Sequence, residues 1–376
     1  MQSFKIGNLT IPVPIIQGGM GVGISLAGLA SAVSNMGGVG VISTIGIGLT
    51  SDTILTAYRQ SNIDAIRKEI QKARELTKGV LGVNIMTVIT NFSDMVKTTI
   101  EEGIDIIFSG AGLPLDLPKY LTNGSTTKLV PIVSSSRAAS IICTKWKQNF
   151  NYLPDALVVE GPKAGGHLGF KADELQKESN TLENLVKEVL EVAKSMKEKY
   201  NKDIPVIAAG GIYTGNDIYQ IMKLGAAGVQ LGTRFIATDE CDASPEFKKT
   251  ILNAKAEDVK IIKSPVGLPG STISNKFLIE ASEGKRRPDT CKYNCIKTCD
   301  PKTTAFCIAD ALVAAYKGNL DNGFAFVGLN AGRVNEMTTV SNIFTELEKE
   351  YSQAQLNNEP PQTNQNETPT IINIKE

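Results

Sequence analysis

Eight short apolar runs, rich in Val and Ile and ending in Gly, Ser, Thr, Gln or Met, are the feature that most restricts the fold of this chain. Unbroken apolarity over five to seven residues is typical of a parallel strand covered on both faces, because a half-exposed antiparallel strand alternates instead. The runs are Val13–Gln17, Val39–Thr44, Val80–Met86, Ile104–Ser109, Leu129–Ser134, Ala156–Gly161, Val206–Gly210 and Gly228–Thr233. They predict eight buried strands.

Helical patterns follow these strands in regular alternation. In Thr181–Tyr200, Leu, Val and Ala recur at helical spacing, with Glu and Lys on the opposite face, so this helix should cover the outside of a sheet. The predicted helices are Ser25–Met36, Asp52–Thr77, Asp94–Glu102, Pro114–Leu121, Arg137–Phe150, Thr181–Tyr200, Gly215–Leu224 and Pro245–Ala254, with two later ones at Ile308–Tyr316 and Thr339–Tyr351. Eight strand–helix units in about 255 residues predict an α/β fold, the closed TIM (β/α)8 barrel; an open, doubly wound sheet is the alternative.

The strand–helix rhythm stops near residue 256, where turn-rich and charged segments begin. We therefore expect four parts: a barrel over residues 1–256, a cap or insertion beside the barrel mouth over 257–335, a C-terminal helix over 336–354 and a disordered tail over 355–376. The last of these is rich in Asn, Gln and Pro.

The charge balance indicates a small-molecule ligand. Lys plus Arg and Asp plus Glu both number 39, so there is no overall positive field to attract a nucleic acid or an anionic membrane surface. No run reaches the ~18 apolar residues of a membrane span, and the N-terminus does not resemble a signal peptide. We expect a cytoplasmic protein.

A glycine-rich segment, QGGMGVG at residues 17–23, stands where the first strand ends and a helix begins. Glycines at this place let backbone N–H groups approach a flat or phosphorylated ligand. A dinucleotide fingerprint would need glycine in place of Leu26 and an acidic residue about twenty positions on, but no acid precedes Asp52. A Rossmann site is therefore excluded, and a tight turn without a ligand stays as the alternative.

Two further glycine turns follow the seventh and eighth strands, at AAGG (208–211) and LGT (231–233). In (β/α)8 enzymes the loops after these strands form the common phosphate site. Backbone amides of Gly210, Gly211, Gly232 and Thr233 could converge on a phosphate without a Lys or Arg side chain. A purely structural role is the alternative.

The chain has a single histidine, His167, in the loop GPKAGGHLGF after the sixth strand. Flanking glycines should present its imidazole at the barrel mouth, where it could accept a proton or hydrogen-bond a ligand. Asn84 ends the third strand with an amide that could bind the edge of a heterocycle or cap a turn.

Four of the six cysteines crowd into one segment, with the spacing C-x3-C-x3-C-x7-C. On a helix the first three would share one face, but the spacing matches neither a zinc knuckle nor an iron–sulfur motif. We expect no metal and a cap packed with small thiols, and leave a metal site open for Cys291, Cys295, Cys299 and Cys307.

Seven segments, in order, resemble the nitronate monooxygenases, also called 2-nitropropane dioxygenases, which are akin to FMN-dependent enoyl-acyl-carrier-protein reductases. They are PIIQGGMGVGIS, GVGVIST, GVNIM, SGAGLP, EGPKAGGHLGF, IPVIAAGGI and GVQLGTRF, and the likeness covers about residues 4–335. This likeness does not separate the members of the superfamily.

The resemblance implies a TIM barrel that binds one FMN, with His167 as the catalytic histidine. It places the FMN phosphate on the two late glycine turns and the ring near the first one. The implied cofactor-binding residues are Gly19, Met20, Gly21, Asn84, Gly210, Gly211, Gln230, Leu231, Gly232 and Thr233. The implied reaction is oxidation of alkyl nitronates by O2 to a carbonyl compound and nitrite, with His167 as base or as the group that orients the substrate.

The alternative activity is reduction of an enoyl thioester or a quinone with NAD(P)H as reductant, because SPVGLPG (264–270) and the cysteine-bearing cap resemble reductase-like members. A flavin-binding barrel without enzymatic activity is the third hypothesis. The sequence does not determine the oligomeric state, and a homodimer is left open.

Overall fold

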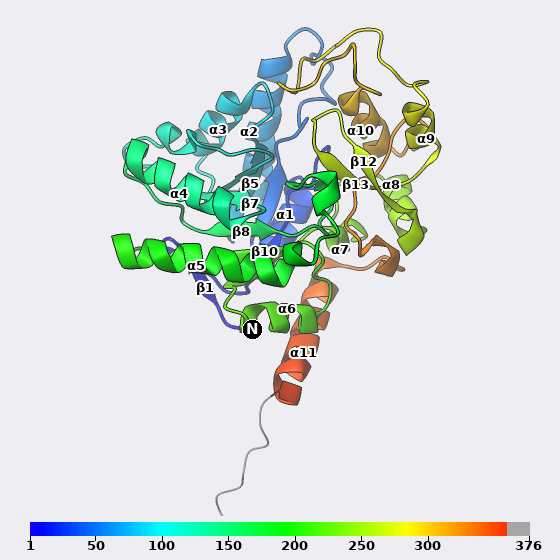
Figure 1. Ribbon diagram of the computed structural model, residues 1–376. Coiled ribbons are helices and arrows are strands. Elements are labelled where there is room, and N and C mark those ends of the chain that lie inside the picture. Colours follow the sequence, from blue (N-terminus) through cyan, green and yellow to red (C-terminus); the bar gives the residue numbers. More distant parts are fainter. Residues whose placement is uncertain (359–376) are drawn as a thin grey trace, which may run out of the picture.

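The computed structural model describes residues 1–358, and its centre is an eight-stranded parallel barrel (Figure 1). The strands are β3 (Ile15–Gln17), β4 (Gly40–Ser43), β5 (Leu81–Met86), β6 (Ile106–Gly110), β7 (Lys128–Val133), β8 (Leu157–Glu160), β10 (Val206–Ala209) and β11 (Gly228–Leu231). They pair in the order β3-β11-β10-β8-β7-β6-β5-β4. A parallel bridge between Ile16 and Val39 joins β3 to β4, so the sheet closes and the predicted TIM barrel is confirmed.

The barrel interior is filled by alternate residues of each strand, as the two-residue period of a strand requires. A buried cluster separate from the outer core holds, for example, Val158 of β8 and Ile207 of β10, while Val159 and Leu157 pack outward under the helices. A hairpin of β1 (Phe4–Ile6) and β2 (Leu9–Ile11) adds two fully buried isoleucines to the inner cluster.

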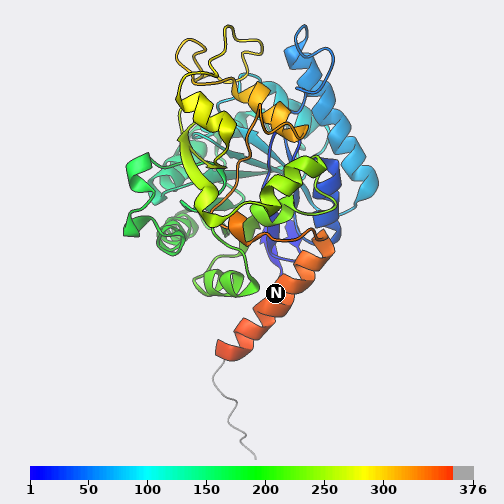
Figure 2. The same ribbon diagram turned by 90° about the vertical axis from the view of Figure 1, so that its right-hand side faces the viewer.

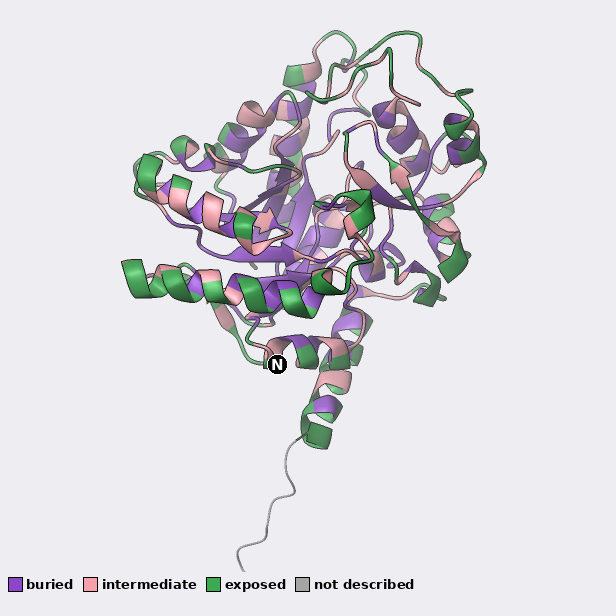
Figure 3. Cartoon of the chain, viewed as in Figure 1, coloured by how far each residue is buried: buried purple, intermediate pink, exposed green. Residues whose placement is uncertain are grey.

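Helices surround the barrel (Figure 2), and all except the short α7, which the sequence did not predict, occur in the predicted order. They are α1 (Ala27–Asn35), α2 (Tyr58–Leu76), α3 (Phe92–Glu101), α4 (Ser136–Phe150), α5 (Leu182–Tyr200), α6 (Gly215–Lys223), α7 (Thr233–Ile236) and α8 (Pro245–Leu252). The predicted amphipathic face of α5 is confirmed: Leu182, Leu185, Val186 and Val189 are buried against the sheet, while most of its Glu and Lys residues face solvent (Figure 3).

Two helix predictions need correction. The expected helix at Pro114–Leu121 is only a 3-10 turn, Leu117–Tyr120, because Pro118 lacks the N–H that an α-helix would use. The helix expected from Asp52 begins at Tyr58 instead. The Thr53 hydroxyl contacts the hydroxyls of Ser51 and Ser61 at 3.0 and 2.8 Å, and such local side-chain bonds compete with helix formation.

Residues 257–335 lie beside the carboxyl ends of the strands. Strands β12 (Val259–Lys263) and β13 (Pro269–Ile273) form an antiparallel sheet with β9 (Gly166–His167), followed by α9 (Lys276–Ser282) and α10 (Ile308–Tyr316). Short 3-10 turns occur at Ala172–Glu174, Glu178–Asn180, Ala256–Asp258 and Ala331–Arg333.

The cysteine segment between α9 and α10 is irregular, so the idea of three cysteines on one helical face is wrong. Its backbone is tied to the loop after β5 instead: the Thr90 N–H donates to the Cys295 carbonyl at 3.1 Å and the Lys297 N–H to the Val88 carbonyl at 2.9 Å. A paired extended segment cannot also make helical hydrogen bonds.

The last helix, α11 (Val340–Asn358), packs against α6 and α1. It runs four residues into the tail predicted from residue 355, and the rest of that predicted tail, 359–376, lies outside the described residues.

Candidate active site

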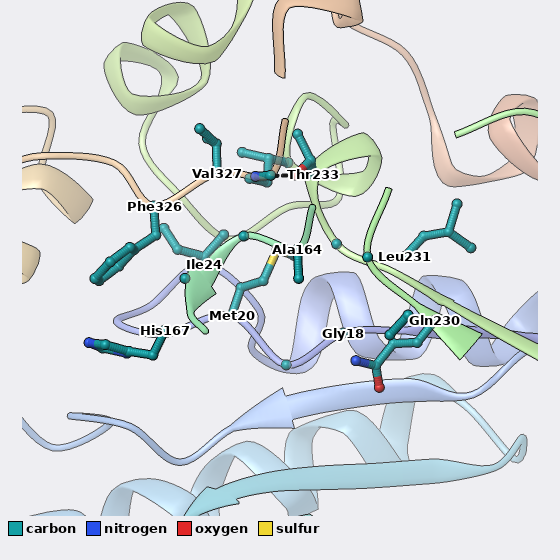
Figure 4. A pocket seen from close by; sticks show the side chains of 18 of the residues that line it. Gly18, Met20, Ile24, Ala164, His167, Gln230, Leu231, Thr233, Phe326 and Val327 are labelled. Carbon is teal, nitrogen blue, oxygen red and sulfur yellow. Dashed lines mark hydrogen bonds between the residues drawn. The ribbon is translucent and has the colours of Figure 1, made fainter. Parts of the chain in front are cut away.

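One pocket opens at the carboxyl ends of the barrel strands, and every residue named from the sequence as a site residue lines it (Figure 4). These are His167 together with Gly19, Met20, Gly21, Asn84, Gly210, Gly211, Gln230, Leu231, Gly232 and Thr233. Parallel strands bring their carboxyl ends to one edge, which is why residues more than 200 positions apart meet here. Their individual roles stay predictions.

The first wall of the pocket is the turn after β3. A Cβ on Gly19 would lie 2.3 Å from the Asn84 Cβ, so only glycine lets this backbone pass over β5. The Gly18 N–H donates to the Leu231 carbonyl at 2.8 Å, and buried Gln17 accepts from the Val41 N–H at 2.9 Å. These bonds hold the turn against the neighbouring strands on both sides.

The second wall consists of the glycine turns after β10 and β11. Gly210 and Gly211 have φ values of +93° and +89°, which residues other than glycine rarely adopt. Residues of the 257–335 segment support both turns: the Asn330 amide donates to the Gly211 carbonyl at 2.9 Å, and the Thr233 hydroxyl accepts from the Gly328 N–H at 3.0 Å.

This cradle fits a flat, phosphorylated cofactor such as FMN. A Cβ on Gly232 would meet only the Met20 sulfur, at 3.6 Å, and a Cβ on Gly166 would meet nothing within 4 Å. Both glycines line the pocket, so side chains there would fill space that the fold keeps open.

His167 lies on β9, which pairs with β13 through His167 and Gly270. Its Nε2 is 2.7 Å from the Ser264 hydroxyl, and its ring centroid is 4.8 Å from that of Phe326. Burial lowers the pKa of His167 to about 4, because the charged imidazolium is poorly solvated there. The imidazole is therefore neutral at neutral pH.

Sequence reasoning missed four residues of this pocket region. Ser264 and Phe326 come from the 257–335 segment, and nothing in their local sequence indicates that they pack on a histidine about 100 positions or more away. Glu160 and Lys163 line the pocket at the end of β8 and in the loop that carries His167. Their position just after a predicted strand was the available signal.

An apolar wall faces the histidine side of the pocket. Phe324 packs edge-on to Phe326 at 4.9 Å, and both line the cavity with Leu312 of α10 and Ile24. Figure 4 shows His167 and Phe326 at one end and Gln230 and Leu231 at the other. The pocket thus has a polar, glycine-rich end and an apolar end.

The four clustered cysteines are not part of this pocket, and all six cysteines are free. Within residues 1–358, no group of three or more His, Cys, Asp or Glu side chains is arranged to hold a metal ion. A cap packed by thiols stays a prediction, and elemental analysis for zinc and iron tests it.

The protein is a (β/α)8 barrel with glycine turns after its first, seventh and eighth strands and one imidazole at its mouth. These features define the class of FMN-dependent oxidoreductases that the resemblance implied. A family model described as nitronate monooxygenase matches residues 2–350. The chain belongs to the nitronate monooxygenase family, and it is a flavoprotein.

Curated relatives agree with this assignment, and solved structures share the fold. A probable nitronate monooxygenase of Staphylococcus saprophyticus is 27% identical over 301 residues, which is 74% of this chain and 80% of that protein. FabK of Thermotoga maritima has 30% identity and a TM-score of 0.71, covering 92% of this chain and 95% of that one. A nitroalkane oxidase of Streptomyces ansochromogenes shares the fold, with a TM-score of 0.70 and 21% identity. The match covers 92% of this chain and 98% of that one.

No helix within residues 1–358 combines the length and the apolarity that a membrane span requires.

Proposed function

We propose that this protein oxidises alkyl nitronates with O2 and releases a carbonyl compound and nitrite. The family match and the relatives named probable nitronate monooxygenase support this reaction. The observation that carries the proposal is the neutral imidazole of His167 at the mouth of a glycine-lined pocket into which a flavin would fit.

Each wall of the pocket has a proposed task. The amides of Gly210, Gly211, Gly232 and Thr233 hold the FMN phosphate, and Gly19, Met20, Gly21, Asn84, Gln230 and Leu231 border the ring. When bound, FMN supplies the redox chemistry by accepting electrons from the substrate and passing them to oxygen. The protein positions the substrate and excludes water.

We propose that His167 orients the substrate. A nitronate is an anion that has already lost its proton, so its oxidation requires no general base. A group with a pKa of about 4 is also a weak base near pH 7. A neutral imidazole can still donate an N–H to the nitronate oxygens, and the Ser264 hydroxyl fixes the ring for that contact.

A second candidate function is NAD(P)H-dependent reduction of an enoyl thioester or quinone. The apolar wall of Phe324, Phe326 and Leu312 favours it, because such a surface suits a hydrophobic acceptor. In both candidates we propose that residues 257–335 act as a cap, since they supply this wall.

One pair of assays separates the two functions. Oxygen uptake and nitrite release on adding ethyl nitronate, with no bleaching of the flavin by NAD(P)H under anaerobic conditions, supports the oxygenase. Rapid anaerobic bleaching by NAD(P)H, without oxygen uptake on ethyl nitronate, contradicts it and supports the reductase.

The variant His167→Ala, which removes both ring nitrogens, tests the orienting role. Losing a hydrogen bond to a charged group costs about 1.5–3 kcal/mol, so kcat/KM for ethyl nitronate should fall about tenfold to about a hundredfold. FMN content should match that of the wild type. A variant that binds FMN and keeps full activity in both assays removes the support for this role.

A further inference from the structure

Ser264 lies in the turn between β12 and β13, and its side chain is almost completely buried against His167. The Ser264 Oγ is 2.7 Å from His167 Nε2, and Ser264 as a whole is only 3% exposed. Either group can be the donor of this hydrogen bond, because a neutral imidazole carries a proton on one nitrogen and accepts on the other. The direction of the bond therefore decides which nitrogen of His167 is left to donate to a substrate.

The turn that carries Ser264 is held by several hydrogen bonds. The Ser264 N–H donates to the Leu268 carbonyl at 3.1 Å, and the Gly267 N–H donates to the Ser264 carbonyl at 2.9 Å. The Thr298 hydroxyl donates to the Val266 carbonyl at 2.8 Å and ties the turn to the cysteine segment. These bonds fix the backbone of Ser264 and so limit the positions that its hydroxyl can take.

Two groups lie within hydrogen-bond distance of the Ser264 hydroxyl in residues 1–358. One is the Val266 N–H, which donates to the Ser264 Oγ at 3.3 Å, an arrangement common for Ser in turns. The other is His167 Nε2. Because an N–H cannot accept, Nε2 is the only acceptor that the described residues offer to the Ser264 O–H. A buried donor without an acceptor is costly, so the hydroxyl donates to Nε2.

The proton of the neutral imidazole must then lie on Nδ1, because a ring nitrogen that accepts a hydrogen bond carries no proton. Nδ1 has no hydrogen-bond partner in residues 1–358. In the same residues, only the Ser271 hydroxyl is both fully buried and without a partner, so Nδ1 is accessible. His167 lines the pocket, and its free N–H is therefore available to a ligand there.

We propose that Ser264 is a positioning residue that selects the Nδ1–H tautomer of His167, and that this N–H hydrogen-bonds the oxygens of a nitronate. The second part rests on the proposed function, since it requires an anionic substrate beside the imidazole. The tautomer itself depends on no reaction. Fixing it before the substrate binds removes a cost that a freely interconverting imidazole would pay on binding.

Nitrogen NMR of the holoprotein tests the tautomer directly, because His167 is the only histidine of the chain. With isotope-labelled histidine, long-range proton–nitrogen correlations identify Nε2, which couples strongly to both ring C–H protons, whereas Nδ1 couples strongly to one. At neutral pH we expect Nδ1 at the position of a protonated nitrogen and Nε2 at that of an unprotonated one. A protonated Nε2, or two nitrogens at the same averaged position, overturns the proposal.

Two serine variants test whether the Ser264 hydroxyl selects the tautomer. Ser264→Ala removes the donor, so both tautomers become populated and the two nitrogen resonances should move toward each other. Ser271→Ala is the matched control, because Ser271 is also buried and its hydroxyl has no partner in residues 1–358. This control should keep the wild-type spectrum. The wild-type pattern in Ser264→Ala, or an equal change in Ser271→Ala, also overturns the proposal.

Two substitutions of His167 test the contact with the substrate. The amide nitrogen of Asn takes the place of Nδ1, whereas that of Gln takes the place of Nε2. If Nδ1–H donates to the nitronate, His167→Asn should keep a kcat/KM for ethyl nitronate about tenfold above that of His167→Gln. Equal values, or the reverse order, contradict the assignment of the donor.

Failure of this inference can be distinguished from failure of the proposed function. A wild-type protein that takes up no oxygen on ethyl nitronate contradicts the proposed function and the substrate contact, while the NMR result for the tautomer stands. A wild-type protein that oxidises ethyl nitronate but carries its imidazole proton on Nε2 contradicts the inference alone.

Discussion

The imidazole of His167 should titrate far below the usual range, and this can be tested without interference because the chain has no other histidine. Burial lowers its pKa from about 6.5 to about 4. Between these values the unfolded chain binds more protons than the folded one, so stability falls as the pH drops. From about pH 7 to about pH 5, this one group should cost about 2 kcal/mol of unfolding free energy.

Two measurements check this. The C2–H resonance of the imidazole should keep its shift from about pH 7 to about pH 5 and move only near pH 4. The variant His167→Gln loses the titration but keeps a side chain that can hydrogen-bond Ser264. Urea unfolding at both pH values should show the wild type losing about 2 kcal/mol more than the variant.

The carboxylates elsewhere in the chain titrate in both proteins, so their contribution cancels in this difference. A resonance that moves with a midpoint near 6.5, or equal pH dependence of the two proteins, would refute the burial argument. It would also return His167 to consideration as a general base.

Two further substitutions test the walls of the pocket. Gly19→Ala places a Cβ 2.3 Å from the Asn84 Cβ and should cost about 1–3 kcal/mol in thermal unfolding, with weaker FMN binding. Gly18→Ala is the control, because its new Cβ would lie no closer than 3.5 Å to any neighbouring atom. Equal melting temperatures for the two variants would contradict the steric reasoning. Ser264→Ala removes the 2.7 Å contact to His167 Nε2. The variant should keep its FMN content but have a kcat/KM for ethyl nitronate about fivefold lower. An unchanged kcat/KM would show that Ser264 does not position the imidazole.

The barrel could be predicted from the sequence because its signals are local. Each strand is a continuous apolar run, and α5 shows its buried face in its own residues. Glycine placement was similarly informative: the AAGG turn was identified from its glycines, and the structure adds that Gly210 and Gly211 have a positive φ. The Pro114–Leu121 helix failed for an equally local reason, the second proline at position 118.

The rest of the site depends on contacts between distant segments, which have no local signature. Ser264 meets His167 only because β13 pairs with β9, and a register of antiparallel strands cannot be read from either segment alone. Glu160 was missed for a different reason. Its position at the end of a strand was visible, but its place in the pocket emerges only when the barrel is closed.

The most direct test of the whole account is the absorbance spectrum of the purified protein, with the flavin identified and quantified after heat release. We expect a yellow protein carrying one FMN per chain and showing the two visible bands of an oxidised flavin. A colourless protein that does not bind added FMN would contradict the assignment of this pocket, and with it the roles given to the glycine turns and His167.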